Sequence, residues 1–200
     1  MVHANAERVA AALRAADAVD AAEGIRELAD SARTAAEAAD ALGVPVGAIV
    51  KSLVFAADGQ PVLVLASGDH QVDTTKVAAI IGAGTVKRAD ADLVRAATGF
   101  PIGGVAPVGH PTALTTVVDE HLGDFDVVWA AAGTPHAVFP TRYDELVRVC
   151  SVGPSFVVAT AGPGSRGSTP SRPLMRSSRV LLTSARAELV IPRSPTSWRL

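Results

Sequence analysis

The chain has 200 residues, 48% of them hydrophobic and 19% charged, a composition that suits one globular domain with an appendage. Its formal net charge of −2 points to neither a nucleic-acid nor a membrane partner, and no stretch approaches the ~20 apolar residues that span a bilayer. Because a lone cysteine, Cys150, excludes an internal disulfide and charged residues interrupt any signal-peptide core near the start, we expect a soluble, cytoplasmic protein.

Helical patterns and one short strand pattern open the chain. Residues 3–17 carry apolar side chains at helical spacing, and residues 25–28 suit a short strand. Thr34 and Glu37 have the spacing of a capping box, in which each side chain bonds the backbone N–H of the other. The helix that they begin should end near Gly43.

A β-hairpin pattern follows. Residues 48–56 and 61–66 have strand patterns, and Asp58 with Gly59 between them is typical of a tight hairpin turn. Asp73 should then cap a short helix that ends near Gly82.

Loops rich in glycine and proline occupy the next part of the chain. Val86 is expected in a strand and residues 90–98 in a helix. Residues 99–111 hold so much Gly and Pro that regular helix is excluded and a shaped loop is predicted. Residues 125–131 have the pattern of a buried strand, and residues 133–136 form a second tight loop.

A second capping-box pattern, from Thr141 to Asp144, predicts a final helix that runs through Val149. Across residues 1–150 hairpins and helices mix without a regular βαβ repeat. The sequence therefore predicts an α+β fold with a mixed sheet.

Residues 151–200 differ in character, with ten Ser, seven Arg and six Pro. This composition favours a poorly ordered C-terminal tail, although apolar runs at 156–159 and 180–182 leave a packed element open. The tail has no Lys and a single acidic residue, so the first 150 residues carry a net charge of −8. Such an acidic body limits any RNA contact to a small local site.

Several sites with strong signatures are excluded. The chain has no G-x-S-x-G elbow, no phosphate-binding G-x-x-x-x-G-K-[ST] loop and no H-E-x-x-H. Residues 162–167 match G-x-G-x-x-G, but Pro170 and Pro173 follow where a dinucleotide site needs a helix. The histidines are scattered, and only His121, which follows Asp119 at strand spacing, has a second ligand type nearby; we expect no metal site.

Lys51 is the most unusual polar residue. It lies in an apolar strand pattern, and alternation places it on one face with Leu53 and Phe55. Burial of an ammonium group without a partner is costly. Lys51 is therefore either an edge-strand lysine that reaches solvent or a cation that lines a pocket for an anionic ligand.

Two loops add to the second alternative. Gly103 and Gly104 let backbone N–H groups approach a ligand, and Pro107 stiffens the same loop. Considered alone, Gly- and Pro-rich loops such as this one and the one at residues 133–136 are usually ordinary turns.

Together these residues resemble a known family. The strand around Lys51, the G-x-x-x-P pattern from Gly103 to Pro107 and the loop ending at His136 occur in the order and spacing of the YbaK/prolyl-tRNA-synthetase-associated editing domains. The resemblance covers about residues 3–150. It implies a mixed, partly barrel-like β-sheet surrounded by helices, with one pocket for the aminoacylated 3′ end of transfer RNA.

The resemblance also implies roles for individual residues. Lys51 and Gly103 would be catalytic, no cofactor or metal would be needed, and His136 stands where some members have a histidine that sets specificity. The expected substrate-binding residues are Ser52, Gly104, Val105, Ala106, Pro107, Gly133, Thr134, Pro135 and His136.

The implied activity is trans-acting hydrolysis of a mischarged transfer RNA of the Ala, Ser or Cys class. An aminoacyl ester beside a ribose hydroxyl needs mainly to be held in attack geometry, with backbone N–H groups stabilising the oxyanion and Lys51 gripping phosphate or polarising the carbonyl. The expected partners are the 3′ end of aminoacyl-tRNA and an aminoacyl-tRNA synthetase, with no membrane and no DNA. The alternative is a non-catalytic module that binds aminoacyl-tRNA or a related nucleotide.

Overall fold

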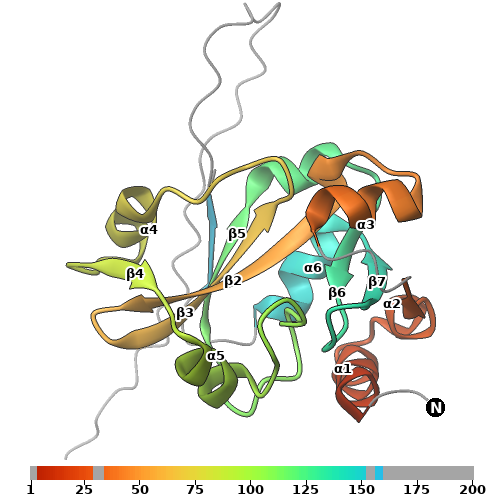
Figure 1. The fold of residues 1–200 in the computed structure, drawn as a ribbon, viewed down its shortest axis with the longest axis horizontal. Helices are drawn as coiled ribbons and strands as arrows, with labels where there is room; N and C mark the ends of the chain where they lie inside the picture. Colours follow the sequence, from red (N-terminus) through yellow and green to blue (C-terminus); the bar gives the residue numbers. More distant parts are fainter. Residues whose placement is uncertain (1–3, 29–33, 152–155, 160–200) are drawn as a thin grey trace, which may run out of the picture.

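The computed structural model describes residues 4–28, 34–151 and 156–159 (Figure 1). The helices are α1 Ala4–Ala15, α2 Val19–Glu23, α3 Ala35–Leu42, α4 Thr74–Ile81, α5 Ala91–Thr98 and α6 Tyr143–Cys150. The strands are β1 Arg26–Glu27, β2 Ile49–Ala57, β3 Gln60–Ser67, β4 Val86–Arg88, β5 Thr115–Asp119, β6 Val128–Ala131, β7 Ala137–Thr141 and β8 Phe156–Ala159. The 3-10 helices are η1 Val46–Ala48 and η2 Glu120–Asp124. Within this described part no helix is long and apolar enough to cross a membrane.

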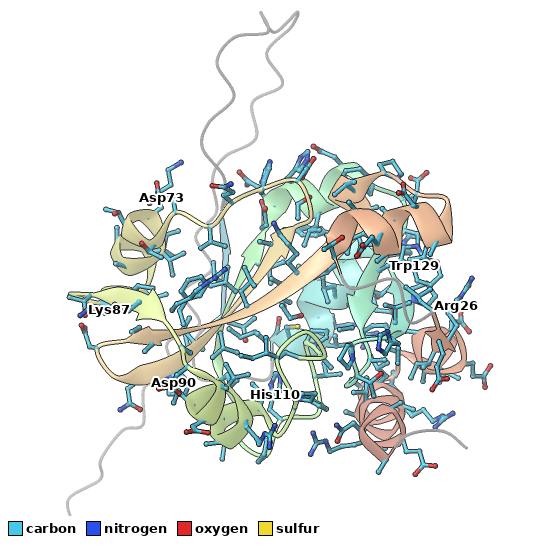
Figure 2. The ribbon with its side chains drawn as sticks, viewed as in Figure 1. Arg26, Asp73, Lys87, Asp90, His110 and Trp129 are labelled. Carbon is cyan, nitrogen blue, oxygen red and sulfur yellow. The ribbon has the colours of Figure 1, made fainter. Side chains whose placement is uncertain are left out.

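Capping side chains and glycines mark the ends of several helices at the positions that the sequence predicts. The Thr34 hydroxyl accepts the Glu37 N–H at 3.2 Å, and the Glu37 carboxylate accepts the Thr34 N–H at 2.8 Å, which confirms the capping box. Asp73 and Asp90 cap α4 and α5 with their carboxylates (Figure 2). Three of these helices end at a left-handed glycine, namely Gly43, Gly82 and Gly99.

Two predicted boundaries are wrong. Thr141 is the last residue of β7, and α6 begins after Arg142 without a side-chain cap. The Thr141 hydroxyl instead donates to the Glu145 carboxylate at 2.7 Å, so the expected capping box does not form. The strand predicted over residues 125–131 begins only at Val128, because the chain bends through the preceding residues after η2.

The strands form one mixed sheet in the order β1-β7-β6-β2-β3-β5-β8, with β4 pairing with β2 outside this path. Parallel pairs join β2 to β6, β3 to β5 and β5 to β8, and the remaining pairs are antiparallel. The hairpin between β2 and β3 turns at Asp58 and Gly59, both with positive φ, as predicted. This mixed sheet surrounded by helices confirms the predicted fold class (Figure 1).

The sheet continues past residue 150. Strand β8 pairs in parallel with β5 along residues 116–119, so the apolar run at 156–159 is a strand of the sheet. The run at 180–182 and most of the predicted tail lie outside the described residues. The division at residue 150 thus stays a prediction.

Helices cover both faces of the sheet. On one face Val50 and Val54 of β2 share the largest core cluster with residues of α1, α2, α5 and α6. On the other face Phe55 packs with Val77 of α4, and Ile49 packs with Ala39 of α3. The alternation of β2 predicted from the sequence therefore divides its buried side chains between one core cluster on the first face and two on the other.

Candidate functional site

Strand β2 is fully paired on one edge and forked on the other. It pairs with β3 over eight residues, but with β6 only through its first two residues and with β4 only through its last three. The Val54 carbonyl accepts the Ala89 N–H at 3.3 Å on the forked edge. Because peptide groups alternate sides along a strand, the N–H and carbonyl of Ser52 also point to this edge. Among the described strands none pairs with Ser52 there.

A cavity of about 490 Å³ adjoins the fork. Five residues predicted for the site line it, namely Lys51, Ser52, Gly103, Val105 and Pro135. The structure thus brings β2, the glycine loop at 99–111 and the loop at 133–136 to one cavity.

Lys51 is half-buried where the cavity meets the turn that follows β3. Its amine donates a hydrogen bond to the His70 carbonyl. Burial lowers the pKa of Lys51, and the negative charges of Asp69 and Asp119 oppose that shift. Because β2 is an inner strand, Lys51 is not the edge-strand lysine that the sequence left open.

Ser52 carries the other polar group at the fork. Its hydroxyl oxygen is buried and has no hydrogen-bond partner in the described part of the chain. A buried hydroxyl without a partner is costly, so Ser52 presents an unused hydroxyl as well as its peptide group beside the cavity.

Sequence reasoning missed several cavity residues. Arg88 brings a second cation from β4, Thr34 comes from the start of α3, and Ile102 is 62% exposed in the glycine loop. Trp129 of β6 also lines the cavity, and the Arg26 guanidinium lies 4.4 Å from the centre of its ring (Figure 2). These residues belong to separate elements, so no local pattern could have grouped them.

The two loops touch one another behind the cavity. A Cβ atom on Gly104 would lie 2.7 Å from the backbone of Thr134, so only glycine allows this approach. The Gly104 N–H donates to the Pro101 carbonyl at 3.0 Å, which removes it as a donor to a ligand. The Thr134 hydroxyl accepts the Ala137 N–H at 3.0 Å and closes its own loop.

The remaining predicted residues do not line the cavity and anchor the loops from behind. The ring of His110 donates to the Ala106 carbonyl at 2.8 Å, and the Cys150 thiol lies 3.7 Å from the Pro107 carbonyl. Burial raises the pKa of this thiol to about 12. In the second loop, Gly133 accepts the Asn5 amide at 3.0 Å, and His136 accepts the Leu28 N–H at 2.7 Å, each through its carbonyl.

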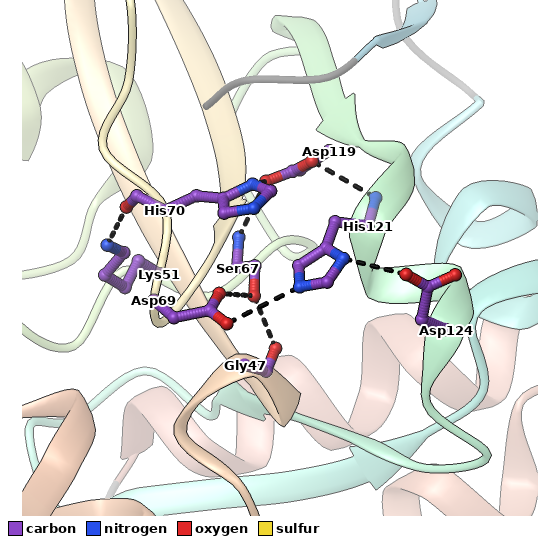
Figure 3. A network of polar contacts seen from close by, with 8 residues as sticks. All are labelled: Gly47, Lys51, Ser67, Asp69, His70, Asp119, His121 and Asp124. Atoms are coloured by element: carbon purple, nitrogen blue, oxygen red, sulfur yellow. Dashed lines mark hydrogen bonds and ion pairs between the residues drawn. The ribbon is translucent and has the colours of Figure 1, made fainter. Parts of the chain in front are cut away.

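A polar cluster supports Lys51 from its other side (Figure 3). We call it the Asp119 cluster, and its members are Ser67, Asp69, His70, Asp119, His121 and Asp124. The Asp119 carboxylate is fully buried and accepts the Ser67 N–H at 3.2 Å, the His70 ring at 2.8 Å and the His121 N–H at 3.2 Å. These bonds fix the turn whose carbonyl holds Lys51.

The sequence suggested that the histidines are scattered, but the structure brings His70 and His121 of this cluster together. The rings of His70 and His121 stack with their centres 4.3 Å apart. The turn after β3 brings in His70, and η2 brings in His121.

Comparison with known proteins places these features in a family context. The profile of the aminoacyl-tRNA editing domain matches residues 29–149. A proline–tRNA ligase of Desulfovibrio desulfuricans is 34% identical over 150 residues, which are 74% of this chain and 25% of the ligase. A proline–tRNA ligase of Lactobacillus gasseri is 37% identical over 112 residues, which are 56% of this chain and 20% of the ligase. The chain thus spans a quarter or less of these curated relatives.

A solved structure covers more of the chain. The crystal structure of a candidate trans-editing enzyme for prolyl tRNA synthetase aligns with a TM-score of 0.75 at 40% identity. The alignment covers 82% of this chain and 100% of that one.

Proposed function

The chain belongs to the aminoacyl-tRNA editing domain family, and on that premise we propose that it is a hydrolase that removes a wrongly attached amino acid from transfer RNA. It would act in trans, on alanyl-, seryl- or cysteinyl-tRNA. The observation that carries the proposal is the cavity beside the fork of β2, with a half-buried lysine at its edge.

The cavity suits the end of an aminoacylated transfer RNA. Ile49, Val54 and Val138 give it apolar walls, and a volume of about 490 Å³ is in the usual range for a small-molecule site. Lys51 and Arg88 add two positive charges within an otherwise acidic domain. A small amino acid side chain would meet the apolar walls, while the terminal phosphate would meet the cations.

Hydrolysis can proceed here without a nucleophilic side chain. A water oxygen attacks the ester carbonyl, the bond between the carbonyl carbon and the ribose oxygen breaks, and the ribose oxygen leaves with a proton. The N–H of Ser52 on the open edge is a fixed donor for the oxyanion that forms. The Lys51 ammonium either stabilises the same charge or grips the phosphate. Gly103 lines the cavity and keeps its wall free of a side chain.

The partners follow from the same site. The 3′ end of the transfer RNA enters the cavity, and the acidic body makes few contacts with the rest of the RNA. We propose that a proline–tRNA ligase supplies the additional RNA affinity, because the relatives that share this domain are proline–tRNA ligases.

A panel of aminoacylated transfer RNAs tests the proposal. The panel consists of proline-specific tRNA charged with alanine, serine, cysteine or proline. The purified chain should deacylate at least one of the three mischarged species and should spare the correctly charged prolyl-tRNA. Release of the labelled amino acid measures the rate against the uncatalysed reaction. Binding of the panel without acceleration of any member would favour the non-catalytic binding module instead.

A further inference from the structure

Three side chains of the Asp119 cluster converge at the molecular surface. Asp69, His70 and His121 each offer a ligand atom, and these atoms lie within 4.8 Å of one another. Their side chains are 47%, 21% and 28% exposed, so solvent reaches the point where they meet. Figure 3 shows both imidazole rings and the Asp69 carboxylate turned toward the same region.

A carboxylate orients each imidazole ring. The Nδ1 atom of His70 lies 2.8 Å from buried Asp119, and the Nδ1 atom of His121 lies 2.8 Å from Asp124. With each Nδ1–H committed to a carboxylate, the lone pair of each ring resides on Nε2. Histidines that bind metals commonly have this arrangement. The carboxylate bonded to Nδ1–H fixes the tautomer and makes Nε2 a more basic ligand for the metal.

The local charge also favours a cation. Asp69, Asp119 and Asp124 bring three negative charges, and the nearby ammonium of Lys51 balances one of them. The Asp69 oxygen already lies 3.5 Å from Nε2 of His121, so two of the three ligand atoms are close to a shared position.

We propose that Asp69, His70 and His121 form a binding site for one Zn²⁺ ion, with water completing the coordination. Two imidazoles and one carboxylate suit Zn²⁺ and disfavour Mg²⁺, which prefers an all-oxygen shell. None of the three ligand residues lines the cavity, so the ion would lie beside the cavity without entering it. There it would stiffen the turn whose His70 carbonyl holds Lys51.

Calorimetric titration of the full-length, tag-free chain with Zn²⁺ tests the site directly. We expect one ion per chain, no comparable binding of Mg²⁺ and a higher melting temperature with Zn²⁺ present. His121→Ala and Asp69→Asn each remove a ligand and should weaken Zn²⁺ binding more than ~100-fold, beyond the range for the loss of an orienting group. Asp124→Asn removes only the orienting carboxylate and should weaken it by about 10-fold to 100-fold.

Two control variants separate this site from chance binding and from the deacylase. His136→Gln changes a histidine outside the cluster and should leave Zn²⁺ affinity unchanged. Lys51→Ala removes a positive charge beside the site and should bind Zn²⁺ at least as tightly, whatever it does to deacylation. Unfolding curves in a chelator would show that His121→Ala is folded. Equal Zn²⁺ affinity of folded His121→Ala and the parent chain would overturn the proposal, as would loss of binding in His136→Gln.

Discussion

The cavity and the Asp119 cluster meet at Lys51, yet they are built in opposite ways. The cavity is roomy, its walls are mainly apolar, and the Ser52 hydroxyl beside it has no partner among the described residues. The cluster is small, and its buried carboxylate accepts three hydrogen bonds. Beside the cavity a buried hydroxyl is left without a partner, whereas the buried Asp119 carboxylate of the cluster is used to hold a turn in place. Substitutions in the cavity should therefore affect activity, and substitutions in the cluster should affect stability first.

Lys51→Ala should give the largest effect in the cavity. We expect deacylation to fall at least ~100-fold, as for loss of a donor that stabilises transition-state charge, while the free energy of unfolding changes little. Single-turnover deacylation and urea unfolding measure the two quantities. Lys87→Ala, on the exposed part of β4, is the matched control and should keep the parent rate. A parent rate in Lys51→Ala would remove this lysine from the mechanism.

Asp119→Asn should give the largest effect in the cluster. The new amide group would face donors that now bond a carboxylate, so we expect a loss of about 2–3 kcal/mol in the free energy of unfolding. Urea unfolding in a chelator measures it. Asp124→Asn changes a carboxylate that is 71% exposed and should stay within ~0.5 kcal/mol of the parent. Similar losses in the two variants would contradict the distinction between buried and exposed members.

Two glycine substitutions test the contact between the loops. Gly104→Ala would place a Cβ atom 2.7 Å from the Thr134 backbone, which should cost about 1–3 kcal/mol and raise KM by moving the loops apart. Gly103→Ala meets nothing nearer than 3.8 Å but has a φ of +85°, so it should cost about 1 kcal/mol. Steady-state deacylation and thermal unfolding distinguish them. A larger KM for Gly103→Ala than for Gly104→Ala would mean that substrate binding depends on the cavity wall at Gly103 more than on the contact between the loops.

Truncation should give the smallest effect. Removal of residues 160–200 leaves every described strand intact, and we expect a nearly unchanged melting temperature. Removal from residue 152 also deletes β8 and leaves the outer edge of β5 unpaired, so the melting temperature should fall. Scanning calorimetry of both truncated chains measures the difference. A fall of several degrees in the first would mean that residues 160–200 contribute to the fold.

The sequence predicted well those elements that depend on neighbouring residues. The Thr34 capping box, the Asp73 cap and the Asp58 turn involve groups a few positions apart, and the structure has all of them. Thr141 is the exception. It has the same capping-box pattern, but the structure includes it in β7 as the last residue, so it does not cap α6. Strand β7 itself had no predicted counterpart, since Pro140 argues against an inner strand and β7 pairs with β6 on one edge and only the short β1 on the other.

The site was only partly predictable for the same reason. Lys51 was recognisable because an apolar strand surrounds it in the sequence. Arg88 and Trp129 reach the cavity only through the pairing of β4 and β6 with different ends of β2, which no local window contains. Stacking of His70 with His121 likewise depends on contacts between residues far apart in the chain.

The thiol of Cys150 is a natural probe of the motion of the glycine loop. It is the sole sulfhydryl of the chain, it faces the Pro107 carbonyl, and burial keeps it in the unreactive protonated form. A thiol reagent can reach it only while the loop and α6 separate. The rate of alkylation under native conditions would therefore report how often the glycine loop separates from α6. A ligand that holds the loop against α6 would slow the alkylation of this natural residue.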